Sequence, residues 1–231
     1  MTIVLEVVDN PRLVAARTAL QAVQHAIHQR GRADVAFTGG VDGTAAAKEF
    51  LSGLAETDID RSLLHFWWAD ERFISFGHEL RNDKPILEEI DRILSLGGIH
   101  LHPAPEPTKY SDVQSAAEMY AQEIHDVTLD VAILGVGADG HIASIFGTDA
   151  SRDDIADVLG VHDSPKYPAQ RLTLSLRRLS EAEVLIVVAT SAEKMTAIRQ
   201  ALDSSGQSPL CRLTQMATVT LIIGRPVYVM T

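Results

Sequence analysis

The chain has 231 residues, of which 46% are hydrophobic and 22% are charged, as in ordinary folded domains and unlike disordered or collagen-like chains. Its 31 Asp and Glu residues outnumber its 20 Lys and Arg residues, and a net charge of −11 repels nucleic-acid backbones and anionic membranes on average. An anionic ligand would therefore need a local cluster of cations. We expect one domain, residues 1–231, with a small-molecule ligand and neither a nucleic-acid nor a membrane partner.

The single cysteine, Cys211, excludes an intrachain disulfide, a CxxC redox pair and a cysteine-rich zinc site. The first residues lack the basic leader and the apolar stretch of a secretion signal, and no apolar run approaches the ~18 residues that a membrane span needs. We therefore expect a cytoplasmic protein.

Strands and helices are predicted to alternate from the start of the chain. A β-branched strand at residues 2–8 stops before Asn10 and Pro11, which can cap a helix and occupy its first position. Apolar residues then recur at three- and four-residue spacing as far as Gly31, as in the buried stripe of a helix.

The same alternation continues along the chain. Further strands are expected at residues 33–40, 63–70, 129–135, 171–176, 183–190 and 218–224, and further helices at about 43–54, 83–95, 111–125 and 191–203. Near-continuous apolar strands between amphipathic helices indicate an α/β fold with a parallel sheet covered by helices on both faces. Ligands of such sheets bind outside the carboxyl ends of the strands, so functional residues are expected in the loops that follow them.

Two of these loops carry glycines or charges directly after an apolar strand. Residues 38–44 read Thr-Gly-Gly-Val-Asp-Gly-Thr, in which the glycines allow backbone N–H groups to approach an anion near the start of the next helix. Residues 70–72 read Asp-Glu-Arg and lie at the rim of the sheet. The alternative interpretations are a plain turn and a solvated loop.

A third loop, Gly135-Val-Gly-Ala-Asp-Gly-His141, formally matches the dinucleotide fingerprint GxGxxG. That fingerprint usually opens the first βαβ unit and precedes a strand ending in an acidic residue, whereas here several elements come first and only a weak apolar stretch leads to Asp157 and Asp163. We favour proton transfer by His141 at a strand-to-helix turn beside Asp139, because an unperturbed imidazole titrates near ~6.5. A purely structural histidine is the alternative.

These segments resemble the 6-phosphogluconolactonase family. The similarity lies in residues 135–146 (GVGADGHIASIF), 68–73 (WADERF), Asn82, 171–182 (RLTLSLRRLSEA) and 191–194 (SAEK). The resemblance implies a Rossmann-like three-layer fold similar to glucosamine-6-phosphate deaminases. It also implies hydrolysis of 6-phospho-D-glucono-1,5-lactone to 6-phospho-D-gluconate in the oxidative pentose phosphate pathway. We expect no cofactor, and no metal is required because the carbonyl of a lactone is already electrophilic.

The resemblance also assigns site residues. His141 is expected to take a proton from the attacking water and return one to the ring oxygen, while Asp70 orients or charge-stabilises the imidazolium. Arg72, Arg171 and Lys194 are expected to hold the phosphate. The full set of expected substrate-binding residues is Gly39, Gly40, Arg72, Asn82, Gly137, Asp139, Arg171 and Lys194.

The chain departs from the family pattern in the first glycine loop, where the family usually reads Ser-Gly-Gly-Ser-Thr-Pro. Asp42 in this loop would weaken anion binding unless it points away. Two other functions stay open: an amino-sugar phosphate deaminase or isomerase on the same fold, and a non-catalytic sugar-phosphate-binding regulator. His100 and His102 have a spacing that metal sites use, but two histidines are too few for such a site. We expect a monomer.

Overall fold

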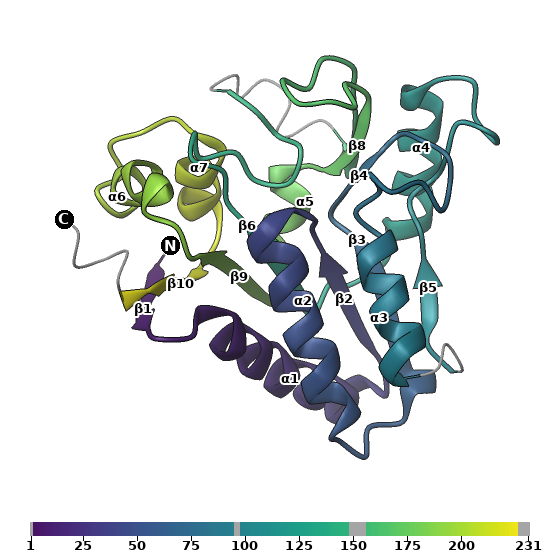
Figure 1. The fold of residues 1–231 in the computed structure, drawn as a ribbon, viewed down its shortest axis with the longest axis horizontal. Helices are drawn as coiled ribbons and strands as arrows, with labels where there is room; N and C mark the ends of the chain where they lie inside the picture. Colours follow the sequence, from purple (N-terminus) through teal and green to yellow (C-terminus); the bar gives the residue numbers. More distant parts are fainter. Residues whose placement is uncertain (1, 95–97, 148–155, 226–231) are drawn as a thin grey trace.

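The computed structural model describes residues 2–94, 98–147 and 156–225, and its centre is a seven-stranded sheet (Figure 1). The strand order is β1-β10-β9-β6-β2-β3-β5, and every neighbouring pair is parallel. The strands are β1 (Ile3–Val8), β2 (Ala33–Phe37), β3 (Leu64–Trp68), β5 (His100–His102), β6 (Val131–Gly135), β9 (Val184–Ala189) and β10 (Val219–Gly224).

A second, antiparallel sheet lies beside the carboxyl ends of these strands. It has the order β4 (Asp70–Arg72), β8 (Arg171–Leu174) and β7 (Val158–Val161). The prediction that residues 171–176 form a strand of the parallel sheet is therefore wrong. All four residues of β8 are buried, and a buried apolar run does not reveal which way its neighbours run.

Helices cover both faces of the large sheet (Figure 1). They are α1 (Pro11–Arg30), α2 (Gly40–Ala55), α3 (Lys84–Leu94), α4 (Val113–Ile124), α5 (Leu176–Ser180), α6 (Met195–Leu202) and α7 (Pro209–Met216), with short 3₁₀ helices η1 (Arg61–Leu63) and η3 (Ala192–Lys194). The sequence did not predict α5 and α7, which are short. In the described part of the chain, no helix combines the length and the apolar character that crossing a bilayer requires.

Two separate hydrophobic cores confirm the three-layer α/β fold. One core joins Trp68 to α1, α2 and α3, and the other joins Trp67 to α4, α5, α6 and α7. Neighbouring residues of a strand point to opposite faces of the sheet, so this Trp pair contributes one ring to each helix layer.

Both predicted ends of α1 are confirmed. The Asn10 side chain accepts a hydrogen bond from the N–H of Leu13 at 3.3 Å, and Pro11 is the first helical residue. Gly31 has a φ of +69°, and its N–H donates to the carbonyl of Ile27 at 2.8 Å. This left-handed conformation disfavours residues with a Cβ atom.

Gly31→Ala is expected to lower the free energy of unfolding by about 1 kcal/mol. A Cβ at Gly31 would meet no atom within 4 Å, so the loss comes from the backbone conformation alone. Gly31→Asn should lose less, because asparagine tolerates the left-handed region. Urea denaturation of the three proteins measures both differences, and an alanine variant as stable as the parent would contradict the interpretation.

Three imidazoles stack at the β3–β5 edge of the large sheet. The ring of His65 lies 4.3 Å from that of His100, and His65 Nδ1 lies 3.0 Å from His102 Nε2. On its other side, His102 Nδ1 lies 2.7 Å from a carboxylate oxygen of Glu123. Among the described residues, no group of three or more His, Cys, Asp or Glu side chains is arranged to hold a metal ion.

The position of His65 in this stack leads us to expect that the stability of the fold depends on pH. Burial, followed by the charge of Arg32, lowers the pKa of His65 to about 4, below the ~6.5 of an unfolded chain. Between these values the unfolded chain binds the proton more strongly, so stability is full above pH ~6.5 and falls as the pH drops toward 4. The melting temperature should therefore drop less between pH 7 and pH 5 in His65→Gln than in the parent protein. An equal drop in both proteins would rule out His65 as the cause.

Candidate active site

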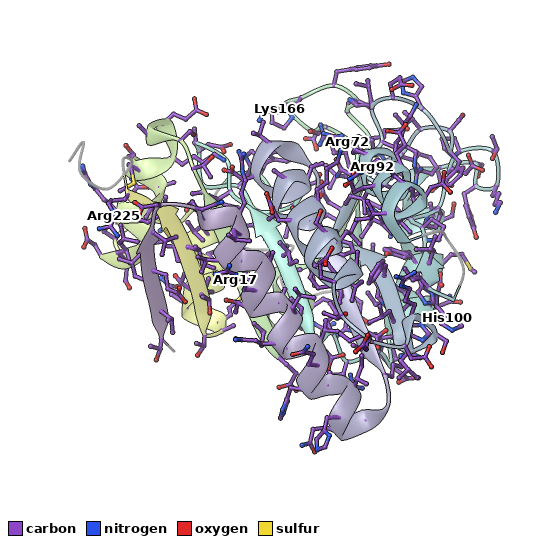
Figure 2. The ribbon with its side chains drawn as sticks, turned by 60° about the horizontal axis from the view of Figure 1, so that its bottom comes forward. Arg17, Arg72, Arg92, His100, Lys166 and Arg225 are labelled. Carbon is purple, nitrogen blue, oxygen red and sulfur yellow. The ribbon has the colours of Figure 1, made fainter. Side chains whose placement is uncertain are left out.

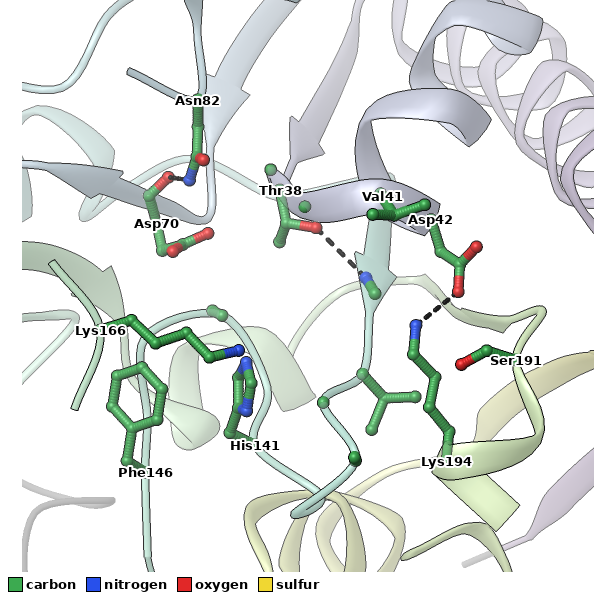
Figure 3. A pocket seen from close by; sticks show the side chains of 18 of the residues that line it. Thr38, Val41, Asp42, Asp70, Asn82, His141, Phe146, Lys166, Ser191 and Lys194 are labelled. Carbon is green, nitrogen blue, oxygen red and sulfur yellow. Dashed lines mark hydrogen bonds and ion pairs between the residues drawn. The ribbon is translucent and has the colours of Figure 1, made fainter. Parts of the chain in front are cut away.

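A pocket of about 490 Å³ opens at the carboxyl ends of β2, β3, β6 and β9 (Figure 3). All expected site residues except Asp139 line it, namely Gly39, Gly40, Asp70, Arg72, Asn82, Gly137, His141, Arg171 and Lys194. They come from segments far apart in the sequence, and the parallel sheet brings the ends of those segments to one edge. This is the place where open α/β sheets bind ligands.

His141 is paired with Asp139 rather than with Asp70. Its Nδ1 lies 2.5 Å from Asp139 Oδ1, and only 17% of its side chain is exposed. The Asp70 carboxylate instead accepts a hydrogen bond from the Ser144 hydroxyl at 2.7 Å. A carboxylate two residues away in the same turn therefore occupies Nδ1, the ring position at which Asp70 was expected to act.

The hydrogen bond between His141 and Asp139 also changes the pKa of Asp139. Burial opposes ionisation of Asp139, but its hydrogen bond to His141 and the charge of that ring outweigh burial and hold the pKa of Asp139 below its ordinary value. A carboxylate that stays ionised favours a proton on Nδ1 of the ring. Nε2 is then the nitrogen that can accept a proton in the pocket.

The turn that carries His141 depends on Gly137. A Cβ at this position would lie 2.0 Å from His141 Nδ1 and 2.5 Å from Asp139 Oδ1, so only glycine leaves room for the pair. The N–H of Gly137 donates to the carbonyl of His141 at 3.0 Å, which closes the turn. Residues 136–147 form turns and isolated bridges, so the expected helix after this loop is absent there. A dinucleotide site needs that helix, and its fingerprint is therefore not realised.

Two guanidinium groups face the pocket from the small sheet. Arg72 and Arg171 are direct partners in the β4–β8 ladder. Arg171 is buried, and it donates to the carbonyls of Pro168 and Lys166 at 3.1 and 2.9 Å. Arg72 donates to the carbonyl of Leu80 at 2.6 Å.

Among the described residues, neither guanidinium forms an ion pair with a carboxylate. Burial, together with the neighbouring charge of Arg72, lowers the pKa of Arg171. The charges of Asp70 and Glu71 act in the opposite direction, but neither carboxylate forms a direct ion pair with Arg171 in the described residues. Two cations held side by side without a direct carboxylate partner can bind an anion.

Lys194 has a different environment. Its Nζ donates to Asp42 Oδ2 at 2.6 Å (Figure 3). Asp42 is buried and faces Lys194, so it does not point away from this end of the pocket. Its charge is compensated there.

A buried carboxylate, Glu71, holds the backbone at Arg72 and Asn82. Glu71 accepts hydrogen bonds from the N–H groups of Arg72, Asn82 and Asp83 at 2.7, 2.7 and 2.8 Å. Burial raises the pKa of Glu71 to about 7. The amide of Asn82 donates to the Asp70 carbonyl at 2.9 Å, and its buried Oδ1 has no partner in the described part of the chain.

Sequence reasoning missed Lys166 and Phe146. Lys166 extends toward His141 in Figure 3, and Figure 2 shows it at the same end of the molecule as Arg72. The Phe146 ring lies 4.9 Å from the His141 ring and 6.0 Å from the guanidinium carbon of Arg171. The signal for Lys166 was its place between Pro165 and Pro168 in the turn leading to Arg171.

Known proteins share this sequence pattern and architecture. Residues 12–222 match the family model described as glucosamine-6-phosphate isomerases/6-phosphogluconolactonase. A 6-phosphogluconolactonase of Streptomyces coelicolor is 33% identical in an alignment that covers 86% of this chain and 85% of that protein. A 6-phosphogluconolactonase structure from Trypanosoma brucei has a TM-score of 0.83 at 20% identity, covering 98% of this chain and 97% of the other. One from Shewanella baltica has a TM-score of 0.81 at 21% identity, covering 97% and 98%.

Proposed function

The chain belongs to the family of glucosamine-6-phosphate isomerases and 6-phosphogluconolactonases, and we propose that it hydrolyses 6-phospho-D-glucono-1,5-lactone to 6-phospho-D-gluconate. The observation that carries this proposal is the pair Arg72 and Arg171, without direct ion-pair partners in the described residues, in the same pocket as His141, whose ring is paired with Asp139. The guanidinium pair suits a phosphate, and the imidazole suits proton transfer at an ester carbonyl.

In the proposed mechanism, His141 Nε2 takes a proton from water as the water oxygen bonds to the lactone carbonyl carbon. The bond from that carbon to the ring oxygen then breaks, and the imidazolium returns its proton to the departing oxygen. Asp139 holds the ring in the tautomer with a free Nε2 and stabilises its positive charge. Asp70, fixed by Ser144, adds a second negative charge at the pocket wall.

The negative charge that develops on the carbonyl oxygen needs hydrogen-bond donors. The N–H groups of Gly137 and Gly140 already donate within their own turn. The backbone of Gly39 and Gly40, at the start of α2, is therefore the better candidate. In the proposed steps, every group that acts on the water and the lactone belongs to this chain.

The phosphate is proposed to bind Arg72 and Arg171, with Lys166 beside them, while Asn82 and Lys194 contact the sugar.

The decisive experiment measures both candidate reactions on the purified protein. Fresh lactone should be hydrolysed well above the spontaneous rate, followed through oxidation of the 6-phosphogluconate formed. Glucosamine 6-phosphate should release no ammonia. Ammonia release faster than lactone hydrolysis would assign the chain to the deaminases, and tight 6-phosphogluconate binding without any turnover would make it a regulator.

We further propose that the reaction belongs to the oxidative pentose phosphate pathway, in the cytoplasm, and that the chain works as a monomer. The buried, free Cys211 suits a reducing compartment.

A further inference from the structure

Asp42 lines one end of the pocket, and both of its carboxylate oxygens accept hydrogen bonds. Its Oδ1 accepts from Arg12 Nη2 at 3.1 Å and from the Thr190 hydroxyl at 2.6 Å. Its Oδ2 accepts from the Thr190 N–H at 3.0 Å and from Lys194 Nζ at 2.6 Å. Burial opposes its ionisation, but the hydrogen bonds from Lys194 and Thr190 outweigh burial and hold the pKa of Asp42 below its ordinary value.

This carboxylate lies where an anion would otherwise be attracted. It belongs to the first turn of α2, which begins at Gly40, and the start of a helix carries partial positive charge. Asp42 supplies a negative charge to that turn from within the chain and pairs with Lys194, the cation lining this end. Glu193 lines the same end and adds another negative charge.

The other end of the pocket has the opposite character. Arg72, Arg171 and Lys166 line it, and none of them forms an ion pair with a carboxylate in the described ranges. The two ends therefore differ in available charge, although both contain cations. Asp70 and Glu71 act on Arg171 only at longer range, whereas Asp42 bonds Lys194 directly. A phosphate gains more where the cations have no direct carboxylate partner.

We propose that Asp42 is a specificity-determining positioning residue that holds Lys194 as a hydroxyl-binding group and so directs the substrate's phosphate to Arg72 and Arg171. The Lys194 ammonium has three donors, of which one serves Asp42. The others suit hydroxyl oxygens of the sugar. This assignment rests on the proposed function for the identity of the sugar, but its charge argument can be tested without turnover.

Binding of inorganic phosphate, measured by calorimetry at pH 7, tests the charge argument. Lys194→Met should change the phosphate affinity less than about twofold, whereas Arg72→Ala should weaken it about tenfold or more. Asp42→Asn should free Lys194 and bring a second phosphate site or about tenfold tighter binding, and Asp42→Asn with Lys194→Met should abolish that gain. Glu193→Gln is the matched control, since it removes a charge from the same end without freeing Lys194, and should have less than about a twofold effect.

Steady-state kinetics on two lactones separate the role of Lys194 from that of Arg72. Lys194→Met should reduce kcat/KM by the same factor for the phosphorylated lactone and for unphosphorylated glucono-1,5-lactone, because both carry the hydroxyls. A loss confined to the phosphorylated lactone would overturn the proposal, as would a loss of phosphate binding in Lys194→Met as large as in Arg72→Ala.

A folded Asp42→Asn with unchanged phosphate binding would also overturn the proposal. If this variant does not fold, the comparison of Lys194→Met with Arg72→Ala still decides it. If neither lactone is hydrolysed by the parent protein, the proposed function fails while the phosphate measurements still report on Asp42.

Discussion

Replacing His141 by Asn is expected to lower kcat by about 10²- to 10⁴-fold, the usual contribution of a positioned general base. The side chain contacts Asp139 and Phe146 at the pocket and is not part of either hydrophobic core, so the fold should survive. Steady-state kinetics on fresh lactone, corrected for spontaneous hydrolysis, measure the loss.

Thermal melting is the control for this variant. A melting temperature near that of the parent, together with near-normal turnover, would remove His141 from the mechanism. Asp139→Asn is the companion variant, because it keeps the size of the partner and removes its charge. Its turnover should also fall, since the neutral amide neither fixes the tautomer of the ring nor stabilises the imidazolium.

Arg72→Ala is expected to reduce kcat/KM for the phosphorylated lactone by roughly 10- to 150-fold, corresponding to the loss of a charge-assisted hydrogen bond of ~1.5 to 3 kcal/mol. Unphosphorylated glucono-1,5-lactone should lose far less, because it never made the contact. Arg72→Lys should recover part of the loss, since a point charge lacks the forked geometry of a guanidinium.

The comparison of the two lactones separates phosphate recognition from damage to the site. Arg171 stays in place in Arg72→Ala, held by the carbonyls of Pro168 and Lys166, so the pocket keeps one guanidinium. Equal proportional losses on both lactones would show that Arg72 acts on the chemistry or the folding. The phosphate would then have to be assigned to Arg171 and Lys166.

The parts predicted well from the sequence are those set by local chemistry. Asn10, Pro11 and Gly31 specify the ends of α1 through caps within a few residues, and Trp67 and Trp68 split between the two cores because strand residues alternate. The glycine loops were found because their backbone demands are also local. The grouping of Gly39, Asp70 and His141 in one pocket then follows from a parallel sheet.

The parts predicted poorly depend on contacts between distant segments. The direction of β8 is set by its pairing with β4, and the two segments are far apart in the sequence. The choice of Asp139 over Asp70 for His141 depends on the path of one turn. From the sequence, Asp42 was expected to weaken anion binding. Its compensating cations Arg12 and Lys194 lie 30 and 152 residues away in the sequence, so their contacts with Asp42 could not be foreseen.

The three residues of β4 alternate between the pocket and the protein interior, and their roles differ accordingly. Asp70 and Arg72 face the pocket, whereas Glu71 is fully buried and holds the backbone of residues 72, 82 and 83 from behind. A library that randomises position 72 can therefore explore other substrates while the bonds from Glu71 to the backbone stay in place. Position 71 is best excluded from such a library, because any residue without two acceptor oxygens would release the loop on which both neighbours depend.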